Sequence, residues 1–127
     1  MQVKFGKWIR DNKYDKNAGF ELKLCKGNNA LPFSAFEPQQ PVSLQKAKHE
    51  FIFKKLSDAD RTLKPFDCFV LAKSEAWVIA GWYHERKGIN VYWLDIDVFL
   101  EEQKTSTRKS ITEERAAEIA SKHFVLT

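Results

Sequence analysis

Three apolar segments in the second half of the chain constrain the fold more than any other feature. PFDCFVLA, EAWVIAGWY and INVYWLDIDVF, residues 65–72, 75–83 and 89–99, are rich in β-branched and aromatic residues and predict three strands. KSE at 73–75 has the composition of a tight turn, and HERKG at 84–88 separates the second strand from the third. Three such segments in succession predict a sheet.

The first half of the chain adds helices and further strand candidates. Apolar residues recur at helical spacing over residues 3–9, which predicts a short amphipathic helix that ends near Asn12. Residues 18–25 alternate with period two, so that Phe20, Leu22 and Leu24 point to one face of a strand. The other elements expected are a helix of about three turns that opens near Pro41, a strand at 51–56, a solvated connector at 101–109, and a last helix from a capping box of Ser110 and Glu113 to about His123.

This order of elements is helix, strand, helix, four strands and helix. It predicts an α/β fold, with α+β as the alternative, in which helices cover a sheet. The length of 127 residues fits one domain over residues 1–127. Asp95 and Asp97 alternate with apolar residues near a strand end, which suggests the outer face of an edge strand, and no chemistry is assigned to them.

The composition indicates a cytoplasmic protein and slightly favours an anionic partner. Lys and Arg exceed Asp and Glu by 21 to 17, a balance that permits a polyanion without requiring one. Two cysteines are too few for a disulfide scaffold, and no Cys/His cluster suggests zinc. The N-terminus lacks the features of a signal peptide, and no apolar stretch approaches the roughly 20 residues that span a bilayer, so we expect no membrane association.

Glu21 and Lys23 interrupt the strand predicted at 18–25 with an acid and a base. Positions two apart on a strand share a face, roughly 6.5 to 7 Å from each other. One use is a structural ion pair on a solvated face, worth about 0–1 kcal/mol. The competing use is phosphodiester cleavage, in which the carboxylate holds a divalent metal and the ammonium orients water or offsets charge on the phosphate.

The residues that follow this pair resemble a known group of nucleases. After the ELK strand come a polar turn, LPFSAF, and Gln40 at the opening of a helix, nineteen positions beyond Glu21. This arrangement resembles the PD-(D/E)xK nuclease superfamily, and more narrowly the Holliday junction resolvases of Gram-positive bacteria and their phages, best over residues 18–50. The resemblance implies a restriction-endonuclease-like mixed sheet flanked by helices. It also implies that Glu21, Lys23 and Gln40 form parts of one metal-and-phosphate site.

The superfamily has a further carboxylate, usually on the strand before the ExK strand, and here the sequence departs from that pattern. Only Asp11 and Asp15 precede Glu21, and neither lies on a predicted strand. Downstream, Lys-Pro-Phe-Asp at a strand start resembles the first acidic motif of the family and ends in Asp67. We therefore expect a rearranged motif order in which Asp67 binds the metal with Glu21, and Asp58 is a further candidate ligand. The alternative is that Asp67 is a turn residue at the strand start.

Basic residues near the N-terminus and around the polar loop at 57–65 are candidates for contacts with DNA phosphates, with a charged surface as the alternative. The three histidines match no metal spacing, and the tryptophans and tyrosines between residues 77 and 93 are expected in the sheet core rather than as base-stacking platforms. The candidate DNA-binding residues are Lys7, Lys54, Lys55, Arg61 and Lys64.

The resemblance implies a hydrolase of DNA recombination. The expected activity is that of a Mg²⁺- or Mn²⁺-dependent endodeoxyribonuclease, a Holliday junction resolvase-like homodimer that cuts branched DNA, encoded by a phage and active in the host cytoplasm. Two alternatives stay open. One is a nuclease of the same fold that acts on DNA ends, flaps or single strands. The other is a non-catalytic DNA-binding or protein-interaction module that retains the fold without a full metal site.

Overall fold

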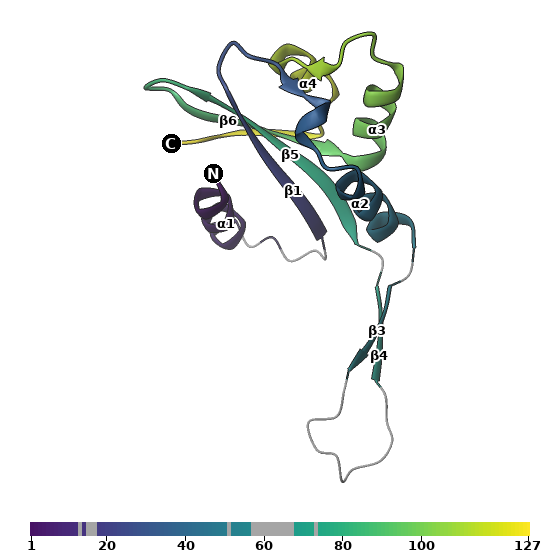
Figure 1. Ribbon diagram of the computed structural model, residues 1–127. Coiled ribbons are helices and arrows are strands. Elements are labelled where there is room, and N and C mark those ends of the chain that lie inside the picture. The colour runs from purple at the N-terminus through teal and green to yellow at the C-terminus, as the bar shows by residue number, and fades with distance from the viewer. Residues whose placement is uncertain (13, 15–17, 51, 57–67, 73) are drawn as a thin grey trace.

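A four-stranded mixed sheet lies at the centre of the computed structural model (Figure 1). In the order β1-β5-β6-β8, β1 runs parallel to β5, whereas β5 pairs antiparallel with β6 and β6 with β8. These strands are β1 (Ala18–Lys26), β5 (Glu75–His84), β6 (Gly88–Asp95) and β8 (Lys122–Leu126). The structure describes residues 1–12, 14, 18–50, 52–56, 68–72 and 74–127.

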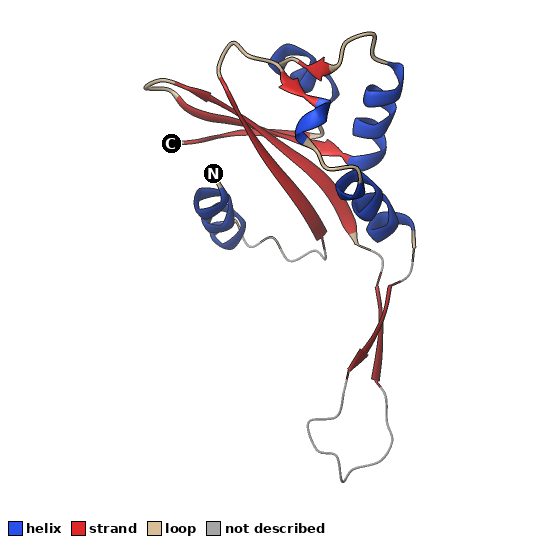
Figure 2. Cartoon of the chain, in the orientation of Figure 1, coloured by secondary structure: helices blue, strands red, loops and turns tan. Residues whose placement is uncertain are grey.

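Helices cover both faces of this sheet (Figures 1 and 2). One face is covered by α1 (Gln2–Asp11), and the other by α2 (Gln39–His49), α3 (Ile96–Thr105) and α4 (Glu113–Ile119). The predicted α/β class, a mixed sheet flanked by helices, is therefore confirmed. None of the helices in the described ranges is both long enough and apolar enough to cross a bilayer.

An apolar cluster fills each side of the sheet, because side chains alternate along the strands. Val78 and Trp82 belong to the cluster beneath α2, α3 and α4, whereas Ile79 and Trp93 belong to the cluster beneath α1. Trp82 and Trp93 are fully buried, as predicted for the sheet core. Tyr83 is 45% exposed and is not part of the core.

The alternation predicted for β1 matches its packing. Phe20 and Leu22 pack against the cluster that contains α1, and Cys25 packs against the cluster on the opposite face. Glu21 and Lys23 share the face of Cys25 by their parity along the strand. They therefore lie on the side of the sheet that α2 covers.

Residues 96–105 form α3, so the expectation of a strand end followed by a solvated connector is wrong. Asp95 caps the helix: its Oδ1 accepts a hydrogen bond from the backbone N–H of Asp97 at 2.9 Å. β6 ends at this cap and lies between β5 and β8. Asp95 and Asp97 therefore begin a helix and do not lie on an edge strand.

The C-terminal region also differs from the expectation of one helix to His123. The N-cap of α4 is Thr112 rather than Ser110, and its Oγ1 accepts from the backbone N–H of Arg115 at 3.2 Å. The helix ends at Ile119, and the next residues form β8, which pairs with β6. Ahead of α4, the short strand β7 (Ser110–Ile111) pairs with β2 (Leu31–Pro32), which leads into the 3₁₀ helix η1 (Phe33–Ala35).

A hairpin of β3 (Ile52–Leu56) and β4 (Cys68–Ala72) forms a separate two-stranded sheet. It projects away from the central sheet as an arm (Figure 1). The chain returns from the arm beside the end of α2, where the backbone N–H of Ser74 donates to the carbonyl oxygen of Ala47 at 2.9 Å. The arm is thus an insertion between α2 and β5.

Candidate functional site

Glu21 and Lys23 lie side by side on β1, as the sequence predicted. Lys23 Nζ is 3.3 Å from Glu21 Oε1, and the side chains are 22% and 25% exposed respectively. β1 is the edge strand of the central sheet, so the pair lies at the border of the sheet. Both groups are held by a strand and remain partly exposed, so that a ligand can reach them.

The segment that leads into α2 lies over this part of β1. Lys23 Nζ is 5.3 Å from the centroid of the Phe36 ring, within the range of a cation–π contact. Further along the helix, Leu44 Cδ2 lies 3.4 Å from where a Cβ on Gly19 would stand. The chain from Phe36 to Leu44 therefore runs antiparallel to β1, above the stretch from Lys23 back to Gly19.

Gln40 lies halfway along the chain between these two contacts, as Glu21 does on the strand beneath. Gln40 is the second residue of α2. Its Oε1 accepts a hydrogen bond from the backbone N–H of Glu37 at 3.0 Å, and its own backbone N–H donates to the carbonyl oxygen of Glu37 at 2.9 Å. This capping bond occupies the amide oxygen of Gln40 and does not use its Nε2 donor.

The described side chains at this site fit a Mg²⁺ ion only in part. Glu21 supplies one carboxylate, and Mg²⁺ is commonly held by one or two carboxylates together with waters and substrate phosphates. In the described ranges, no group of three or more His, Cys, Asp and Glu residues could hold a metal. Asp58 and Asp67, the further ligands expected from the sequence, lie outside the described residues.

The predicted DNA-binding residues are spread over several parts of the chain. Lys7 is exposed on α1, which covers the face of the sheet opposite Glu21 and Lys23. Lys54 and Lys55 belong to β3 in the arm. Arg61 and Lys64 lie outside the described residues.

A second polar cluster, centred on Glu113, was not anticipated from the sequence. Glu113 Oε1 is 2.6 Å from His84 Nε2, and Glu113 Oε2 accepts from Asn90 Nδ2 at 3.0 Å and from the Tyr92 hydroxyl at 2.9 Å. The cluster borders a cavity of about 430 Å³. Three members come from the β5–β6 hairpin, and Glu113 comes from α4, more than twenty residues further along the chain, so no local motif could have indicated the cluster.

The hydrogen bonds of this cluster change the titration of its members. Burial alone would raise the pKa of Glu113, but the hydrogen bonds from Asn90, His84 and Tyr92 outweigh it and hold that pKa below its ordinary value. Burial, together with the bond to Glu113, raises the pKa of Tyr92 to about 12. Glu113 is therefore a charged anchor between α4 and the sheet.

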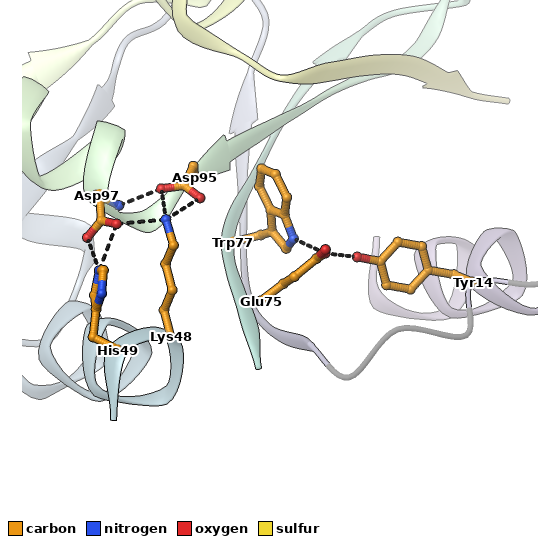
Figure 3. Close-up of polar contacts among 7 residues, drawn as sticks. All are labelled: Tyr14, Lys48, His49, Glu75, Trp77, Asp95 and Asp97. Carbon is orange, nitrogen blue, oxygen red and sulfur yellow. Dashed lines mark hydrogen bonds and ion pairs between the residues drawn. The ribbon is translucent and has the colours of Figure 1, made fainter. Parts of the chain in front are cut away.

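A third cluster joins the end of α2 to the start of α3 (Figure 3). Lys48 Nζ lies 2.8 Å from Asp95 Oδ2 and 2.7 Å from Asp97 Oδ2, and His49 Nε2 is 2.8 Å from Asp97 Oδ2. The hydrogen bond from Lys48 is the main reason why the pKa of Asp97 lies below its ordinary value. Because the Lys48 ammonium lies between the two carboxylates, this cluster is better explained as an ion-pair contact that holds α2 against α3 than as a metal site.

The fold and the candidate site define a class in physical terms: an α/β chain that carries an acid–base pair on an edge strand beneath the start of a helix. Comparisons of the chain with protein-family models, with curated proteins and with solved structures found no match.

Proposed function

We propose that this chain is a metal-dependent DNA endonuclease that cleaves branched DNA in the manner of a Holliday junction resolvase. The observation that carries this proposal is the juxtaposition of Glu21 and Lys23 on an edge strand, where the ring of Phe36, four residues before Gln40, faces Lys23. An ion pair of this exposure adds only about 0–1 kcal/mol to stability. Stability alone gives little reason to place both charges on the covered face of a sheet strand.

Glu21 would hold Mg²⁺ or Mn²⁺ through its carboxylate oxygens, with Asp67 as the second proposed ligand and Asp58 as a further candidate. When bound, such an ion neutralises charge on the phosphate and lowers the pKa of a coordinated water. One described carboxylate with access to solvent is compatible with this role, because waters and phosphate oxygens supply the remaining ligands of Mg²⁺.

Lys23 and Gln40 would position the phosphodiester. Once the Glu21 carboxylate is engaged by a cation, the Lys23 ammonium is available to a phosphate oxygen, and the ring of Phe36 fixes its place. The Nε2 group of Gln40 can donate to a phosphate oxygen or to a water. Two symmetric cuts in a junction require two such sites, which a homodimer with a two-fold axis would provide.

Cleavage of a mobile four-way junction tests this assignment. Glu21→Gln should lower the nicking rate in Mg²⁺ by at least about a hundredfold, the size of effect expected when a charge-stabilising group is lost, while junction binding in Ca²⁺ persists. Glu85→Gln, which removes an exposed acid in the β5–β6 turn, is the matched control and should cleave normally. Cleavage by Glu21→Gln at the wild-type rate would show that the site is wrongly assigned.

The substrate and the presence of catalysis are tested separately. Comparison of the junction with linear duplex, flap and single-stranded DNA distinguishes a resolvase from a nuclease that acts on ends or flaps. The single carboxylate that the described residues place at the site favours a second candidate, a non-catalytic DNA-binding or interaction module. Calorimetric titration with Mn²⁺ decides this point, because a module without a metal site would show no binding above the nonspecific background.

A further inference from the structure

A cavity of about 330 Å³ lies between the end of α3 and the start of α4. Five residues with hydroxyl groups line it: Thr105, Ser106, Thr107, Ser110 and Thr112. The sequence suggested only a solvated connector over much of this segment. A hydroxyl group donates a hydrogen bond without bringing a negative charge, so a wall of hydroxyls suits an anionic ligand.

Among the described residues, basic side chains without an ion-pair partner outnumber unpaired acidic ones around this cavity. Glu102, which lines the cavity, is paired with Arg115, whose Nε donates to Glu102 Oε1 at 2.9 Å and whose Nη2 donates to Oε2 at 3.0 Å. Arg115 also donates from Nη1 to Glu118 Oε2 at 2.7 Å, and Glu118 does not line the cavity. Arg108 also lines the cavity, and Arg108 and Lys109 are exposed and form no ion pair with the described carboxylates. The loop therefore combines hydroxyl donors with two cations whose charge the described side chains do not balance.

This loop is fastened to the segment that borders the candidate active site. The carbonyl oxygen of Lys109 accepts from the backbone N–H of Phe33 at 3.0 Å, and Ile111 pairs with Leu31. Phe36, three residues beyond Phe33, carries the ring that faces Lys23. Phe33, Phe36 and Ile111 pack in the same cluster, so the loop and the Glu21–Lys23 pair lie on one face of the sheet.

We propose that the loop of residues 106–109, between α3 and β7, binds a phosphate group of the nucleic-acid strand that enters the candidate active site. Arg108 at the cavity and Lys109, the next residue, supply the charge. The Thr105 hydroxyl already donates to the carbonyl oxygen of Glu101, so the hydrogen bonds to the phosphate oxygens come from the hydroxyl groups of Ser106, Thr107, Ser110 and Thr112. The identity of the ligand as a nucleic-acid strand rests on the proposed function, whereas the preference for a phosphate rests on the cavity itself. Contacts of this kind fix the register of a strand without reading its sequence.

The salt dependence of junction binding tests the proposal, measured in Ca²⁺ so that no cleavage occurs. Each phosphate contact adds roughly 0.7 to 0.9 to the slope of log K against log salt. The double variant Arg108→Gln/Lys109→Gln should weaken binding and reduce this slope by about 1 to 2. Arg86→Gln/Lys87→Gln removes the same charge from the exposed β5–β6 turn and should leave the slope near that of the wild type.

Three further measurements make the outcome decisive. Arg108→Lys/Lys109→Arg keeps both charges and should restore the slope, and thermal unfolding checks that each variant is folded. An unchanged slope in the Gln variant, or an equal change in the control, overturns the proposal.

A second experiment titrates inorganic phosphate into the protein. If the Gln variant loses phosphate binding while its junction binding is unaffected, the cavity binds a small anion and not a nucleic-acid strand. The nuclease proposal is tested by a different measurement, cleavage of the junction by the wild type. If the wild type does not cleave, the salt dependence of its junction binding still tests the phosphate contact.

Discussion

At the scale of single residues, Glu113 contacts three other side chains through one carboxylate. One carboxylate receives bonds from Asn90 and Tyr92 and contacts His84, and so joins α4 to the hairpin of β5 and β6. A partly buried carboxylate with several donors stabilises the fold in its charged form. The pKa of Glu113 is accordingly lowered.

Glu113→Gln should lower the free energy of unfolding at pH 7 by about 1–3 kcal/mol, because buried donors lose a charged acceptor. The sign of the pH dependence follows from the lowered pKa: the stabilisation is present above the ordinary value of 4.5 and is lost as pH falls through the lower pKa of the folded state. The wild type should therefore lose more stability than the variant between about pH 5 and pH 3. Denaturant unfolding at several pH values measures both effects.

Glu114→Gln provides the control, because Glu114 is exposed and adjacent in the chain. It should change the free energy of unfolding by no more than about 0.5 kcal/mol, as is usual for a surface substitution. Equal effects of the two substitutions would mean that the Glu113 contacts are not what stabilises this corner of the molecule.

At the scale of elements, α3 depends on a cap that also takes part in an ion cluster. Asp95 accepts from the backbone N–H of Asp97 and from Lys48. Asp95→Ala should cost about 1–2 kcal/mol of unfolding free energy, since it removes both the cap and an ion-pair partner. Asp95→Asn, which can still cap, should recover most of that loss, and thermal unfolding compares the two variants. If both variants melt alike, the cap contributes little.

The sequence predicted the elements whose periodicity is long and clear. α1 and β1 appear close to the expected residues, because their apolar positions repeat over several turns or pleats. β5 follows from its run of β-branched and aromatic residues, and α2 follows mainly from Pro41 in its first turn. The sequence does not predict the helix at residues 96–105, because IDVFL continues the apolar character of β6 and no glycine or proline marks the end of the strand. The Asp95 cap was present in the sequence but was interpreted as part of a strand alternation. β8 is only five residues long, and its pairing with β6 decides its structure.

Some features of the candidate site could likewise be predicted from the sequence, and others could not. The placement of Glu21 beside Lys23 follows from strand parity alone, and the position of Gln40 at the start of α2 follows from Pro41 in the first turn of the helix. The Glu113 cluster depends on a contact between α4 and the β5–β6 hairpin, which no periodicity reports. The residues that line the cavity beside Arg108 all lie between Glu102 and Arg115, but the cavity forms only because the chain turns between α3 and α4. The expectation that Asp67 completes the site stays a prediction.

At the scale of the whole molecule, the arm of β3 and β4 is a self-contained insertion. Its strands pair with each other and not with the central sheet, and its return lies beside Ala47 at the end of α2. Replacement of residues 51–73 by a short Gly/Ser linker should therefore leave the central fold intact, with a melting temperature within a few degrees of the wild type. If Asp67 binds the metal, junction cleavage should be lost with the arm.

Two measurements separate the outcomes of this deletion. Circular dichroism during heating reports the fold, and the nicking assay reports the activity. A large fall in melting temperature would show that the arm supports the central sheet, and retained cleavage would exclude Asp67 and Asp58 as ligands. Asp67→Asn in the full chain distinguishes loss of that carboxylate from loss of the arm as a whole.

The parallel pairing of β1 with β5 also governs how the chain reaches its native state. Ala18 and Glu75 pair across more than fifty residues of chain, so this register cannot form until a long loop has closed. The arm lies within that loop and lengthens it. Refolding of the chain without the arm should consequently be faster than refolding of the full chain, and the pairing that builds the Glu21 strand into the sheet should be among the late events of folding.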